Sequence, residues 1–146
     1  MNRVFKTIVL LLVIQISYST VLYAQEFSDY KIGEKLEGKD MVNMDIGGLP
    51  GTLFIYTHKN KVIRSMGFVP SRDGGINPSK VMKGDFIRFK SFMEQYYQSG
   101  FERTIDTAQK KQHYKLKYNG CNVVITIDEF DGDFSYSSLV FMINKI

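Results

Sequence analysis

Two alternating runs joined by Asn119-Gly120 constrain the fold of this chain more than any other feature. Residues 112–118 place Tyr114 and Leu116 on one face of an extended strand and charged or polar side chains on the other. Residues 121–128 return with Cys121, Val123, Ile125 and Ile127 on one face. Asn-Gly favours the tight type I′ turn of a β-hairpin. The sequence therefore predicts an antiparallel hairpin with one buried face.

Further strands and one helix are predicted upstream of this hairpin. Residues 52–58 and 62–69 are rich in β-branched and aromatic side chains and flank Lys59-Asn60-Lys61, a pattern typical of a second hairpin. Residues 70–78 contain turn formers and predict a loop. The helix is expected to begin at Asn77-Pro78 or at Asp85 and to end with Gly100 at its C′ position. Its apolar stripe, spaced by three and four residues, consists of Met82, Phe86, Phe89, Met93 and Tyr96.

The chain ends in a strand over residues 134–146, whose segment 139–143 is apolar on both faces and predicts a central position. Residues 102–107 are an ambiguous edge strand. Residues 25–50 form an irregular arm with one short strand near 41–46, and residues 51–146 form a single domain. The predicted class is α+β: an antiparallel sheet of about five strands, in the order hairpin, helix, meander, with one main helix packed on one face.

Residues 1–24 have the three-part pattern of a secretory signal peptide. Arg3 and Lys6 precede an apolar run at residues 8–14, and Ala24-Gln25 offers a cleavage bond, with the bond after Ser19 as the alternative. The run is about half of the ~20 apolar residues that span a bilayer. We therefore expect export to the periplasm or the medium, with no membrane span after cleavage.

Charge and cysteine content narrow the classes of function. Loss of Arg3 and Lys6 lowers the formal net charge from +4 to +2. This balance does not favour a nucleic-acid partner, which requires a dense basic surface. The single cysteine, Cys121, excludes a disulfide framework within the chain and is expected to be a buried thiol.

The signal ending Ala24-Gln25, the first hairpin, the helix Phe86-x-x-Phe89-x-x-Phe92-Met93-x-x-Tyr96 ending at Gly100, and the closing strands resemble small exported proteins of the Bacteroidetes. Some of those proteins have a two-layer build similar to β-lactamase-inhibitor-like domains. The resemblance implies export and the α+β class. It implies no functional residue.

Catalytic and metal-binding patterns are weak. There is no Gly-x-Ser-x-Gly motif, and alternation puts Cys121 inside and His113 outside, which does not favour a thiolate pair. The acidic turn with Asp128, Asp131 and Asp133 is a calcium candidate, although Met142 stands where an EF-hand has its twelfth-position Glu. We expect no cofactor and no enzyme activity.

The face of the sheet away from the helix is the predicted binding site. It is expected to combine an apolar centre with a basic border, and its members are His113, Lys115, Lys117, Val124, Thr126, Val140 and Met142. The alternative is that the N-terminal arm, through Ile32 and Leu36, folds back over this face. A basic border suits an acidic protein, and equally an anionic glycan or lipid head group.

The function that these patterns favour is a non-enzymatic binding module, inhibitor-like or immunity-like, whose partner is another protein. The runner-up is an envelope protein that binds a lipid or glycan through its aromatic-rich interior. An enzyme of unknown type is the third hypothesis.

The signal-peptide interpretation makes the first testable prediction. Protein recovered from the envelope or the medium should begin at or near Gln25, because the apolar run is too short to anchor the chain. Mass spectrometry of the intact protein measures this N-terminus. A chain that keeps Met1 and needs detergent for solubility would show that the segment is an anchor.

Overall fold

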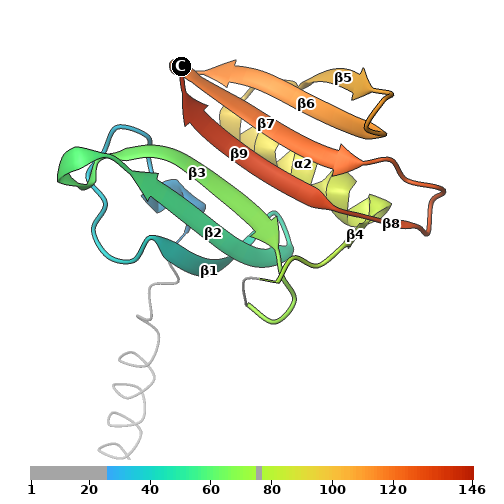
Figure 1. Cartoon of the computed structure of the whole chain (residues 1–146), viewed down its shortest axis with the longest axis horizontal. Coiled ribbons are helices and arrows are strands. Elements are labelled where there is room, and N and C mark those ends of the chain that lie inside the picture. The colour runs from blue at the N-terminus through green and yellow to red at the C-terminus, as the bar shows by residue number, and fades with distance from the viewer. Residues whose placement is uncertain (1–25, 75–76) are drawn as a thin grey trace, which may run out of the picture.

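The computed structural model describes residues 26–74 and 77–146, and the predicted signal peptide lies outside this part of the chain. Seven strands form one antiparallel sheet in the order β1-β2-β3-β9-β7-β6-β5 (Figure 1). A two-stranded sheet, β4-β8, lies beside it. The elements are η1 (Phe27–Asp29), β1 (Met41–Ile46), β2 (Leu49–Thr57), η2 (Lys59–Lys61), β3 (Ile63–Pro70), β4 (Val81–Met82), α2 (Lys83–Tyr97), β5 (Glu102–Asp106), β6 (Lys111–Tyr118), β7 (Cys121–Asp128), β8 (Tyr136–Ser137) and β9 (Leu139–Lys145).

The predicted hairpins are present. β6 pairs with β7 across Asn119 and Gly120, whose φ angles of 47° and 71° fit the type I′ turn. β2 pairs with β3 across η2, where Asn60 takes a positive φ of 66°. A third hairpin joins β1 to β2 through Gly47 and Gly48, both with positive φ. The turns of these three hairpins therefore set the register of five of the seven strands in the large sheet, namely β1, β2, β3, β6 and β7.

The predicted class, α+β with an antiparallel sheet, is confirmed, but the estimate of about five strands is wrong. β1 and β5 extend the sheet at its two edges, and β4 with β8 makes a separate pair. The closing strand starts at Leu139 and not at Phe134, because Tyr136 and Ser137 pair with Met82 and Val81. As expected from its apolar run, β9 is central and lies between β3 and β7.

The core lies between the sheet and one layer formed by α2 and the N-terminal arm. Phe89 of α2 is fully buried, and its ring centroid lies 5.8 Å from that of Phe68 on β3 and 5.9 Å from that of Phe141 on β9. Aromatic pairs at such distances stabilise a core beyond the area that they bury. Truncation of a buried phenylalanine costs about 3–5 kcal/mol, so this contact is a main attachment of the helix.

The helix ends differ from the sequence prediction. Residues 81 and 82 are extended in β4, so the helix begins at Lys83 with Met82 as its N-cap, and neither Asn77 nor Asp85 caps it. At the other end, Gln98 adopts the left-handed conformation, two residues before Gly100. The buried stripe closes with Tyr97, whereas Tyr96 is 38% exposed.

The N-terminal arm packs on the same side of the sheet as α2. The ring of Phe27 lies 5.2 Å from that of Tyr96 on α2 and 5.8 Å from that of Phe141 on β9. Leu36 is buried in the same core, and Ile32 packs against it. The alternative in which Ile32 and Leu36 cover the opposite face of the sheet is therefore wrong. In Figure 1, η1 and α2 both lie behind the sheet.

Two glycines in the sheet give a matched prediction for stability. A Cβ at Gly51 would lie 2.5 Å from the Phe68 ring and 2.5 Å from the Val69 carbonyl oxygen, which is backbone and cannot yield. Gly51→Ala should lower the free energy of unfolding by about 1–3 kcal/mol. A Cβ at Gly67 meets only the flexible Met142 thioether closely, at 2.8 Å, so Gly67→Ala should change it by about 1 kcal/mol or less. Urea denaturation measures both; equal losses would contradict the assignment.

Candidate binding surfaces

The face of the sheet opposite α2 collects all seven residues predicted for binding, and we call it the open face. Its register places Val124 opposite Met142 on β9 and opposite Lys115 on β6. Thr126 lies opposite Val140 on one side and His113 on the other, and Lys117 continues the face along β6. The helix and η1 are on the other side, so no helix of the described residues covers this face.

The centre of the open face is apolar. Val140 is 39% exposed, and Val124 and Met142 are half-buried. Met142 pairs with Gly67, and its sulfur lies close to where a Cβ would stand there. Phe54 lies across from Gly67 on β2, and Tyr56, 52% exposed, follows two residues later. Sequence reasoning missed these two aromatic side chains, although the alternation of residues 52–58 carried the signal.

The border of the open face is basic on the β6 side. Lys115 and Lys117 are exposed and make no ion pair within the described chain. His113 is held by its neighbour, with Nδ1 3.0 Å from the hydroxyl oxygen of Thr126. At the opposite edge of the open face, Thr52 is buried. Gly74 belongs to the loop after β3, and a Cβ there would lie 2.9 Å from the side-chain amide of Asn43 on β1. This loop therefore limits the open face at that edge.

The acidic turn does not gather its carboxylates. Asp133 pairs with Lys83 at 2.6 Å, and this hydrogen bond holds the pKa of Asp133 below its usual value. Asp128 accepts a hydrogen bond from the Ser138 hydroxyl. Within residues 26–74 and 77–146, no three acidic, histidine or cysteine side chains lie together as a metal site. Asp128 and Asp133 thus serve separate local contacts.

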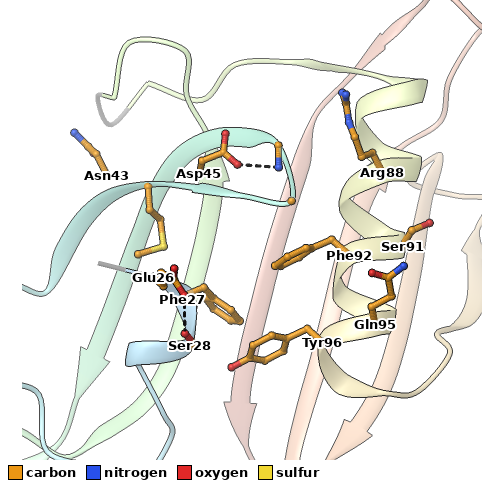
Figure 2. A pocket seen from close by; sticks show the side chains of 13 residues that line it. Glu26, Phe27, Ser28, Asn43, Asp45, Arg88, Ser91, Phe92, Gln95 and Tyr96 are labelled. Atoms are coloured by element: carbon orange, nitrogen blue, oxygen red, sulfur yellow. Dashed lines mark hydrogen bonds between the residues drawn. The ribbon is translucent and has the colours of Figure 1, made fainter. Parts of the chain in front are cut away.

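A second surface lies on the helix side, where the sequence offered only the aromatic-rich interior as an alternative binding region and named no site residue. We call it the helix groove: it runs between η1 with Glu26, β1 with its turn at Gly47-Gly48, and the α2 residues Arg88, Ser91, Phe92, Gln95 and Tyr96. Figure 2 shows Phe92 and Tyr96 projecting from α2 toward Phe27. Its volume is about 1180 Å³. A Cβ at Gly47 would lie 2.8 Å from the Cβ of Phe92, so a glycine allows the turn to reach the helix.

A smaller hollow of about 370 Å³ lies beside the helix groove. We call it the tyrosine cavity because Tyr30, Tyr96, Tyr97 and Tyr118 line it, together with Cys121. Phe27 and Tyr96 belong to the linings of both hollows. Desolvation raises the pKa values of Tyr30, Tyr96 and Tyr97, so their phenols are neutral at physiological pH.

Comparisons of this chain with protein-family models, with curated proteins and with solved structures find no match. No helix in the described residues is long and apolar enough to span a membrane.

Cys121 gives a prediction about reactivity. Its side chain is only 6% exposed, and Sγ lies 3.8 Å from the Asn119 carbonyl oxygen, on the opposite face of the sheet from His113. Burial raises the pKa of the Cys121 thiol, an effect that the charge of Lys145 partly offsets. Iodoacetamide should therefore label the native protein at least about tenfold more slowly than the protein in denaturant.

The raised pKa of the Cys121 thiol also makes the stability of the folded protein depend on pH. The neutral thiol is favoured in the folded state, so its contribution to stability is complete below the unfolded pKa and is lost as the pH rises through the higher folded pKa. Rapid labelling of the native protein, or a dimer that reduction dissolves, would contradict a buried unpaired thiol.

Proposed function

We propose that the protein acts after export, in the periplasm or the medium, as a non-enzymatic module that binds a partner protein through the open face. The observation that carries this proposal is the apolar centre of that face, formed by Val124, Val140 and Met142, on a side of the sheet where no described helix lies. Exposed apolar patches with polar rims are typical of protein–protein interaction sites.

The border supports an acidic surface on the partner. Lys115 and Lys117 extend from β6 without ion-pair partners in the described chain, so opposing carboxylates would gain from pairing with them. Charge complementarity of this kind speeds association and selects among partners. Met142 adds a flexible, polarisable side chain that adapts to a partner's shape.

An inhibitor or immunity protein is the concrete version of this function. Such proteins act by occupying a partner's surface and need only a rigid scaffold. A seven-stranded sheet with a packed aromatic core is such a scaffold. The inhibitor or immunity role is proposed by analogy with proteins of similar architecture, whereas mutation tests the open face directly.

The test combines two substitutions on the open face. A photoreactive residue at Val140 should crosslink to a discrete partner, which mass spectrometry then identifies for purification. Val124→Asp with Lys115→Glu should weaken binding to that purified partner by at least about 30-fold, which corresponds to ~2 kcal/mol. The free energy of unfolding should change by no more than about 1–2 kcal/mol, since neither side chain enters the core.

The matched control makes the same two kinds of substitution, apolar to Asp and Lys to Glu, at exposed positions outside the open face. Ile87 on α2 is 52% exposed and Lys35 is exposed in the N-terminal arm, so Ile87→Asp with Lys35→Glu should leave partner binding unchanged. A folded Val124→Asp, Lys115→Glu variant that binds normally would refute the proposal. A variant that unfolds would also refute it, because the two side chains would then be buried.

A further inference from the structure

We infer that the helix groove forms a binding site for a neutral oligosaccharide, separate from the open face. The groove follows the side of α2 from Arg88 to Tyr96, where the rings of Phe27 and Tyr96 lie 5.2 Å apart and border the tyrosine cavity as well. Its volume of about 1180 Å³ suits more than one sugar ring.

Aromatic rings supply the surface on which a sugar would stack. Phe92 and Tyr96 are 37% and 38% exposed, and their rings lie 6.4 Å apart at an interplanar angle of 24°. Tyr96 also contacts Phe27 at 5.2 Å. Sugar rings present C–H groups with a small positive charge to the negative faces of aromatic rings.

Polar side chains between these rings supply hydrogen bonds for sugar hydroxyls. Ser91 and Gln95 lie on the same side of α2 as Phe92 and Tyr96 and make no hydrogen bond in the described chain. Ser28, at the facing wall, only reaches Glu26 at 3.4 Å. An aliphatic chain would desolvate these groups without replacing their hydrogen bonds to water, which disfavours a lipid tail.

The charges along the site favour a neutral ligand. Arg88 is the cation that lines the groove in the described residues, and its pair with Asp85 balances its charge. Glu26 and Asp45 in the groove would further repel an anion.

The experiment titrates the purified protein with cellohexaose, maltohexaose, xylohexaose or chitohexaose. The protein is used as its producing cells process it, with the N-terminus that they leave. Calorimetry measures the affinity of the protein for each hexaose. The chain has no Trp, so the tyrosine emission that a sugar on Tyr96 would alter is not masked. At least one hexaose should bind. Tyr96→Ala should weaken that binding by about tenfold or more, whereas Tyr96→Phe, which keeps the ring, should stay within about threefold.

Three results would overturn the inference: no hexaose binding up to millimolar concentration, equal binding by Tyr96→Ala, or occupation by the apolar dye N-phenyl-1-naphthylamine that no hexaose displaces. Ile87→Ala, on α2 but outside the groove lining, is the matched control and should bind as the parent does. The Val124→Asp, Lys115→Glu variant should also bind the hexaose normally, so failure here and failure of the protein-binding proposal are distinguishable.

Discussion

The pairing of β9 with both β3 and β7 is the constraint on which the rest of the structure depends. In the part of the chain that the structure describes, the β1–β3 hairpins and the β5–β7 meander share no ladder of their own, and within the sheet only this last strand joins them. Phe141 marks the junction: it lies across from Phe68 and Ile125 in the sheet and contacts the rings of Phe27 and Phe89 above it. One strand thus fixes the two halves of the sheet, the helix and the arm in a single core.

Much of this fold follows from local sequence signals. Alternation and the Asn119-Gly120 turn predict β6 and β7, and the two-sided apolar run predicts that β9 is central. Pairing at the edges of the sheet is harder to predict. β5 is almost wholly exposed and has little apolar pattern, so the sequence predicts only an ambiguous edge strand there. The β4–β8 pair has no local signal, because Val81 pairs with Ser137, which lies far along the chain.

The two candidate surfaces differ in how they could be foreseen. The open face follows from period-two alternation, because fixing the buried face of β6, β7 and β9 also fixes the other face. The helix groove depends on tertiary placement. Tyr96 and Tyr97 both fit the spacing of the helical stripe, and only the approach of Phe27 and of the Gly47-Gly48 turn decides that Tyr96 borders a hollow while Tyr97 is buried.

The central place of the C-terminal strand also orders folding along the chain. Until β9 is available, β3 and β7 are open edges, and the apolar side chains of Phe68 and Ile125 lack the neighbour that covers them. The sheet therefore cannot close before residues 139–145 are present, which makes folding dependent on contacts distant in sequence. A chain with this topology completes its large sheet only when its last strand is available. Phe141 contacts the helix and the N-terminal arm and lies across from strands of both halves of the sheet, whereas the open face and the helix groove each lie on one side of the sheet. Substitution of Phe141 should therefore lower the free energy of unfolding more than substitution of a residue on either surface.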